Sequence, residues 1–242
     1  MYQKLKDFQF TIVALILGIA LVCTTVFAVC AFNKDGIAVT GSAFKVVKSD
    51  TAVLKLELRA TNASKSSAYN KIKSQIPTVK DFLIKKGIKE NEITVLPAST
   101  YNNYKMNPIN GYSTNIIESY VFEQAIQVKT NNVDKVQELS VSAQELLDKG
   151  IDVNIYSPEY LYSKLGEIKV ELLKEASEDA KERAKGMLSA TGNCVGKISS
   201  VKMGVFQITP VDSTDVSDSG YSDTTAIEKK VTAVANVTFK IK

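Results

Sequence analysis

The feature that most constrains this chain is an uncharged apolar run close to its N-terminus. Residues 10–32 read FTIVALILGIALVCTTVFAVCAF, 23 residues without a charged side chain. As a helix, which rises about 1.5 Å per residue, such a run covers about 34 Å and crosses a bilayer with some tilt. The sequence therefore predicts an N-terminal membrane anchor over residues 1–35.

The charges on either side of the apolar run indicate its orientation. Lys4 and Lys6 precede it together with the free amino terminus, whereas Lys34 follows it beside Asp35. By the positive-inside rule the N-terminus is cytoplasmic and everything after the run is extracytoplasmic. The predicted location is thus the cell membrane, with a single pass.

A cleaved signal peptide is the alternative for the same run. Ala28 and Cys30 could serve as the small residues of a cleavage site before Ala31. The apolar run is longer than a typical signal-peptide core, which favours an uncleaved anchor. Both alternatives export the rest of the chain.

The remaining residues, 36–242, are predicted to form one domain with a substantial core. The chain has 45% hydrophobic and 23% charged residues, an ordinary globular composition. Its net charge of +4 comes almost entirely from lysines interspersed with 26 acidic residues, because Arg59 and Arg183 are the only arginines. A nucleic-acid surface normally clusters its basic residues, so no nucleic-acid partner is expected.

The chain lacks the usual catalytic residue types. It contains no histidine, which removes the commonest general base and the commonest transition-metal ligand. Cys23 and Cys30 lie in the apolar run, and Cys194, alone in the domain, is expected to be a buried structural thiol. No Gly-x-Ser-x-Gly pattern occurs in a supporting context. No catalytic residue, cofactor or metal site is therefore predicted.

Four aspartates in an acidic, serine-rich segment, residues 210–228, invite a calcium interpretation. Asp212, Asp215, Asp218 and Asp223 are spaced by 3, 3 and 5 residues, whereas a calcium loop places oxygen ligands at alternate positions and closes with a glutamate. The segment is instead predicted to be a solvated, mobile loop.

Hydrophobic periodicity predicts an α+β domain with a mainly antiparallel sheet and three helices, in the order ββαββαβαββ. The first two strands, within residues 36–60, are expected to pair with each other across the turn at Ser49 and Asp50. Pro77 is expected to kink or restart the first helix. The other predicted strands cover 92–104, 119–130, 151–156, 195–209 and 230–241, and the predicted helices cover 64–86, 132–149 and 164–191.

The third helix carries a narrow apolar stripe that is rich in alanine. The stripe comprises Leu165, Ile168, Leu172, Ala176, Ala180, Ala184 and Met187. Small side chains let a neighbouring element approach closely, so something is expected to pack tightly there. A second copy of the chain or another part of this chain could supply it.

These features together resemble the SIMPL-domain family, exported bacterial proteins whose biochemical role is poorly defined. The resemblance rests on Ile37-Ala38-Val39-Thr40-Gly41, on Ser49-Asp50-Thr51-Ala52 and on EASEDAKERAKGMLSATGNCVGKI at 175–198. Pro77, the long tyrosine-rich loop over 101–112 and the segment 227–230 depart from the family pattern. The resemblance implies a role in the envelope and in stress tolerance, and it supplies no catalytic residues.

Tyrosines are the side chains that best suggest an interaction surface. The candidates are Tyr101, Tyr104, Tyr112, Tyr120, Tyr160 and Tyr162. Tyrosine is favoured at interfaces, although the same residues could pack on strand faces with their hydroxyls at the rim. The predicted function is a non-enzymatic, membrane-anchored protein that binds an envelope protein or assembles as a homo-oligomer. A hydrolase built on paired carboxylates, which needs no histidine, is the alternative.

Overall fold

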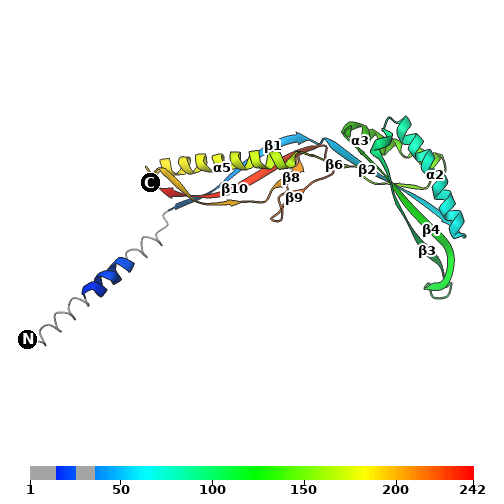
Figure 1. Cartoon of the computed structure of the whole chain (residues 1–242), viewed down its shortest axis with the longest axis horizontal. Helices are drawn as coiled ribbons and strands as arrows, with labels where there is room; N and C mark the ends of the chain where they lie inside the picture. The colour runs from blue at the N-terminus through cyan, green and yellow to red at the C-terminus, as the bar shows by residue number, and fades with distance from the viewer. Residues whose placement is uncertain (1–14, 26–35) are drawn as a thin grey trace, which may run out of the picture. The chain divides into compact units, whose positions relative to one another are not determined.

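The computed structural model describes residues 15–25 and 36–242 (Figure 1). Residues 15–25 are helical. Among the described residues, no helix combines the length and the apolar character that a bilayer crossing requires. The predicted anchor over 10–32 lies largely outside the described residues, as do its flanking lysines and the alternative cleavage site.

The elements of the domain are labelled in Figure 1. In chain order they are β1 (Gly36–Lys48), β2 (Thr51–Asn62), α2 (Lys65–Lys85), the 3₁₀ helix η1 (Glu90–Glu92), β3 (Ile93–Met106), β4 (Ser113–Thr130), α3 (Val133–Ser142), α4 (Glu145–Asp148), β5 (Val153–Ile155), β6 (Glu159–Leu161), α5 (Leu165–Ser189), β7 (Val195–Met203), β8 (Gln207–Pro210), β9 (Tyr221–Ser222) and β10 (Glu228–Ile241). Every described strand pairing with a register is antiparallel except that of β8 with β9. The α+β class is thus confirmed.

The chain divides into two compact units. The first comprises Met1–Ala43, Leu173–Gly204 and Val234–Lys242, and the second comprises Phe44–Leu172 and Val205–Ala233. The elements β1, α5 and β10 each have residues in both units. That residues 36–242 form a single domain stays a prediction.

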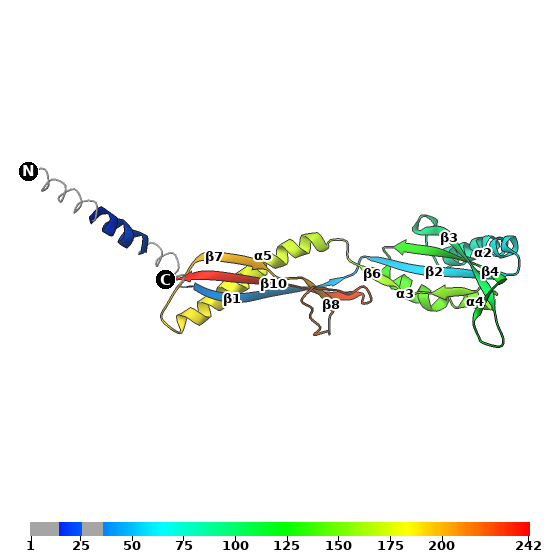
Figure 2. The ribbon, with the colours of Figure 1, turned by 90° about the horizontal axis from the view of Figure 1, so that it is seen from below.

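In the first unit, α5 packs on strands (Figure 2). β10 pairs with β7, and Val39 of β1 joins Val237 and Phe239 of β10 in a small core. The alanine stripe faces this core, with Ala176, Ala180 and Ala184 fully buried. The buried row steps by four residues, so Leu188 follows Ala184. The prediction of Met187 in the stripe was wrong, because its side chain is 59% exposed.

The close packing predicted for the alanine stripe is confirmed, and the partner belongs to the same chain. A Cβ atom added to Gly41 would overlap the carbonyl oxygen of Ala176 and lie 2.8 Å from the Cα of Ala180. The next residue, Ser42, donates its backbone N–H to Asp179 Oδ2 at 2.8 Å. Arg183 Nε donates to the same oxygen at 2.8 Å. Gly41 therefore lets β1 lie directly on α5.

In the second unit, a sheet in the order β3-β4-β2-β5 has helices on one face. β2 pairs antiparallel with β4 along its length, and β5 and β6 pair with its other edge. Alternate residues of β2 (Leu54, Leu56, Leu58) are fully buried in a core with α2 and α3. The helix α2 is one span that includes Pro77, so of the two predicted alternatives the helix does not restart there.

The predicted pairing of the first two strands was wrong, because β1 belongs to the sheet of β10 and β2 to the other sheet. Between them, Ser49 and Asp50 do not close a hairpin. The N–H of Ser49 donates to the carbonyl of Ile227 at 2.8 Å, and that of Asp50 donates to the carbonyl of Leu161 at 3.0 Å. These hydrogen bonds to segments distant in sequence hold the two residues that connect β1 in one sheet with β2 in the other.

The remaining differences concern element boundaries. The predicted helix over 132–149 is divided into α3 and α4 at Ala143 and Gln144, and the predicted strand over 195–209 is divided into β7 and β8. The short strands β6 and β9 were not predicted. The described order therefore has one α-helix, the 3₁₀ helix η1 and several short strands more than ββαββαβαββ.

Candidate interaction surface

The strands β3 and β4 form a hairpin that is longer than the strand beside it. The last pair between β2 and β4 joins Asn62 to Tyr120, whereas β3 and β4 continue to pair from Asn103 with Ser119 out to Met106 with Ser113. Residues 103–119 thus form a two-stranded hairpin arm. Figure 1 shows the turn of this arm extending past the ends of β2 and α2.

The turn of the arm is built from asparagine, proline and glycine, as its sequence predicts. Gly111 has a φ of 69°, a left-handed conformation that glycine adopts readily. The side-chain oxygens of Asn107 and Asn110 accept hydrogen bonds from the N–H groups of Ile109 and Tyr112 at 2.9 and 3.0 Å. The turn is therefore held by its own side chains.

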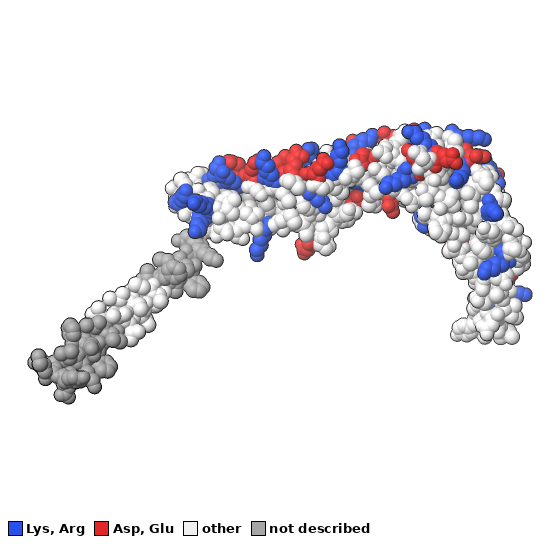
Figure 3. Space-filling model, viewed as in Figure 1, with Lys and Arg blue, Asp and Glu red and all other residues white. Residues whose placement is uncertain are grey.

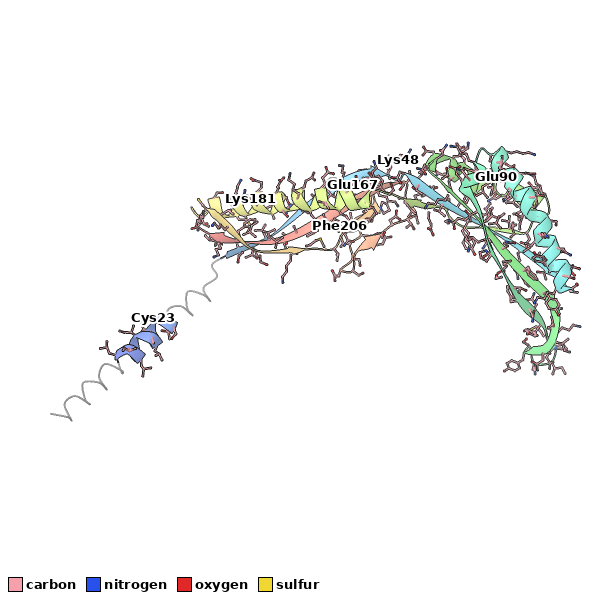
Figure 4. All side chains as sticks on the ribbon, in the orientation of Figure 1. Cys23, Lys48, Glu90, Glu167, Lys181 and Phe206 are labelled. Atoms are coloured by element: carbon pink, nitrogen blue, oxygen red, sulfur yellow. The ribbon has the colours of Figure 1, made fainter. Side chains whose placement is uncertain are left out.

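Apolar side chains at the end of the arm are exposed. Residues 106–117, here called the arm tip, contain no charged residue, and Figure 3 shows this end of the second unit without blue or red atoms. Met106 is 63% exposed, Ile109 93%, Tyr112 73% and Ile116 60%. In Figure 4 the side chains of the tip project outward with no other element over them. Contiguous exposed apolar side chains mark interaction sites.

The structure brings four of the six candidate tyrosines to this hairpin. Tyr104 and Tyr112 lie on the arm, and Tyr101 and Tyr120 lie at its base. Tyr160 belongs to the core of the second unit and is only 5% exposed, so it is no part of a contact surface. Tyr162 is half-buried beside a separate hollow of about 490 Å³. The apolar residues of the tip were missed, although the absence of charge over 106–117 was the available signal.

A polar network lies at the base of the hairpin, on the sheet face opposite the helices. Tyr101 Oη donates to Glu123 Oε1 at 3.0 Å and accepts from Arg59 Nη2 at 3.1 Å. Tyr156 Oη donates to Glu57 Oε2 at 2.6 Å. Burial and the bond to Glu123 raise the pKa of Tyr101, and chiefly the bond to Glu57 raises the pKa of Tyr156. Both tyrosines therefore remain protonated hydrogen-bond donors.

This network borders a hollow of about 300 Å³. Its lining includes the carboxylates of Glu57, Glu123 and Asp152 together with Arg59 and Asn154. Glu57 lies on the face of β2 opposite the buried leucines, and the pairing of Arg59 with Glu123 across β2 and β4 brings Glu123 to the same face. Both glutamates have cations nearby, because Lys55 lies 3.6 Å from Glu57 and Arg59 lies 3.7 Å from Glu123.

One part of the acidic segment 210–228 is buried, and not solvated as predicted. Asp223 is buried, and its carboxylate accepts hydrogen bonds from Lys229 Nζ and from the N–H groups of Thr225 and Ala226. Burial alone would raise the pKa of Asp223, but these bonds outweigh it and hold that pKa well below its ordinary range. Within residues 15–25 and 36–242, no three His, Cys, Asp or Glu side chains are placed to hold a metal ion.

Cys194 was predicted to be buried, and that prediction was wrong. Its side chain is exposed, while its backbone N–H and C=O exchange hydrogen bonds of 2.8 Å with Lys242. The residue thus sits at the open end of the β7 and β10 pair, where the backbone is paired and the side chain faces solvent.

Comparison with known proteins supports the resemblance to the SIMPL-domain family. The search of curated proteins found no match. The sequence model of one family, SIMPL, described as a protein of unknown function (DUF541), matches residues 37–239, nearly the whole domain from β1 to the end of β10. The chain therefore belongs to the SIMPL family.

Proposed function

We propose that this protein is a non-enzymatic binding protein of the cell envelope, held at the membrane by residues 10–32, whose contact surface is the hairpin arm. The observation that carries the proposal is the exposure of Met106, Ile109 and Tyr112 at the end of the hairpin arm. Loss of such apolar area from water favours association. The absence of histidine and the membership of the SIMPL family support a binding role with no catalytic step. A link to stress tolerance comes from the family resemblance.

The test is site-specific photo-crosslinking in cells. A photoreactive amino acid replaces Tyr112 in the full chain, and a matched control carries it at Val216, which is 83% exposed in the acidic segment. We expect an adduct, with protein or with lipid, from position 112 and not from position 216. Equal labelling at both positions, or at neither, would show that the arm is not the contact surface.

A second candidate function is hydrolysis by paired carboxylates, favoured by the convergence of Glu57 and Glu123 in one hollow. Glycosidases use two carboxyl groups roughly 5–10 Å apart. Its test is an activity screen of the purified chain with glycoside, ester and peptide substrates. Turnover that disappears in both Glu57→Gln and Glu123→Gln variants would establish the enzyme and overturn the non-enzymatic proposal.

A further inference from the structure

We propose that the arm tip, residues 106–117, enters the surface of a lipid bilayer. The proposal rests on the proposed function, since it names the class of partner that the hairpin arm contacts. It concerns a lipid contact made by the folded domain, separate from the anchor over residues 10–32.

Several backbone N–H groups of the tip have hydrogen-bond partners within the tip itself. The N–H groups of Ile109 and Tyr112 donate to the side chains of Asn107 and Asn110. The N–H of Gly111 donates to the carbonyl of Asn107 at 2.8 Å, and the N–H of Asn107 donates to the carbonyl of Tyr112 at 2.8 Å. In lipid an unpaired backbone group is costly, because no water replaces the missing partner. These four N–H groups therefore need no water as a partner.

The side chains of the tip have the matching chemistry. Met106, Ile109 and Ile116 are apolar and exposed, and Tyr112 belongs to a residue type that is enriched where bilayer meets water. The nearest basic residue in sequence, Lys105, directly precedes the tip. A lysine there can extend its charge toward headgroups while its stem follows the apolar surface.

A second copy of the chain is a poorer match for this tip. The larger hollows of the second unit, of about 550, 490 and 300 Å³, are lined with lysine and acidic side chains. Uncharged side chains that entered them would separate those charges from water with no compensating contact. A bilayer requires no preformed apolar pocket, and the predicted anchor keeps one close to the domain.

The chain contains no tryptophan, so a Tyr112→Trp variant of the full chain carries one fluorophore at the tip. The variant is reconstituted in phosphatidylcholine vesicles whose acyl chains are brominated, which quenches tryptophan only within the bilayer. Tyr221→Trp, on β9 in the same unit, is the matched control because Tyr221 is also exposed. We expect quenching of at least about two-fold for Tyr112→Trp and none for Tyr221→Trp.

A second variant separates tip from anchor. Ile109→Asp, added to Tyr112→Trp, should abolish the quenching, while flotation of the chain with the vesicles persists through residues 10–32. Loss of flotation in Ile109→Asp would show that the arm tip holds the chain on the vesicles and that residues 10–32 do not. No quenching in vesicle-bound Tyr112→Trp would overturn the inference. A shift of the tryptophan emission spectrum that disappears on dilution below one chain per vesicle would also overturn it, because it would indicate contact with a second copy of the chain. A protein adduct at position 112 in cells, together with no quenching in vesicles, would overturn the inferred lipid contact. It would leave the proposed binding function of the arm in place.

Discussion

Lys229 Nζ lies 2.9 Å from Asp223 Oδ2, and the two side chains are only 3% and 4% exposed. Removal of the lysine from such a pair leaves a buried charge without its counter-ion. We expect Lys229→Met to lower the free energy of unfolding by about 3–5 kcal/mol, measured by urea unfolding of the full chain in detergent. Lys185→Met is the control, because its pair with Glu182 is exposed and worth about 0–1 kcal/mol. Equal losses of unfolding free energy in the two variants would contradict the prediction that the buried pair contributes more than the exposed pair.

The same aspartate makes stability depend on pH. Its pKa in the folded chain lies below the ordinary value of 3.8, so in acid the unfolded chain binds the proton first. The contribution of Asp223 is present at pH values above 3.8 and decreases as the pH falls below it. We expect Asp223→Asn to show a smaller loss of stability between pH 6 and pH 3 than the parent chain. Parallel pH profiles for parent and variant would refute this.

Gly41 is predicted to tolerate no side chain. Because a Cβ would overlap the backbone of α5 at Ala176, we expect Gly41→Ala to destabilise the chain by about 1–3 kcal/mol. Gly186, also in the first unit on α5, has open space around it. Gly186→Ala should therefore stabilise the helix by about 0.5–1 kcal/mol. Thermal unfolding followed by circular dichroism compares the two, and shifts of the same sign would contradict the prediction.

The topology of the chain can be tested with added protease. If Lys4 and Lys6 are cytoplasmic and residues 36–242 are outside, protease added to intact spheroplasts should digest the domain. Protection of the whole chain would refute the orientation. Release of a soluble domain that begins near Ala31, without protease, would instead favour a cleaved signal peptide.

Assembly into homo-oligomers is predicted through a sheet edge rather than through the acidic segment. β3 is an edge strand of the second sheet, and unpaired edge groups recruit further strands. We expect light scattering of the detergent-solubilised full chain to show a concentration-dependent oligomer. The oligomer should persist when residues 211–219 are replaced by a Gly/Ser linker. A monomer at every concentration, or an oligomer lost on replacement, would contradict the prediction.

Periodicity and turn residues were sufficient to predict most of the elements but not their partners. The stripe of α5 followed from spacings of three and four residues. The separation of β1 from β2 depends on hydrogen bonds from Ser49 to Ile227 and from Asp50 to Leu161, which join segments far apart in sequence. The burial of Asp223 likewise depends on Lys229 and on a turn, so composition alone suggested a solvated loop.

The candidate surface was predictable in part. The positions of the tyrosines identified the hairpin through Tyr101, Tyr104, Tyr112 and Tyr120. The same criterion also selected Tyr160, which is buried in the core of the second unit. The exposure of Ile109 could not be predicted, because isoleucine is usually buried and only the excess length of β3 and β4 over β2 leaves it uncovered.

The first unit contains residues of both β1 and β10, and this determines when it can form during synthesis. Thr40 Oγ1 of β1 donates to Asn236 Oδ1 of β10 at 2.7 Å, across 196 positions of sequence. A growing chain acquires β1 well before β10, so β1 has no β10 to pair with until most of the chain has been synthesised. The core of the second unit, by contrast, is drawn chiefly from residues 52–160. We therefore expect the second unit to fold before the first, with β1 pairing only when β10 is present.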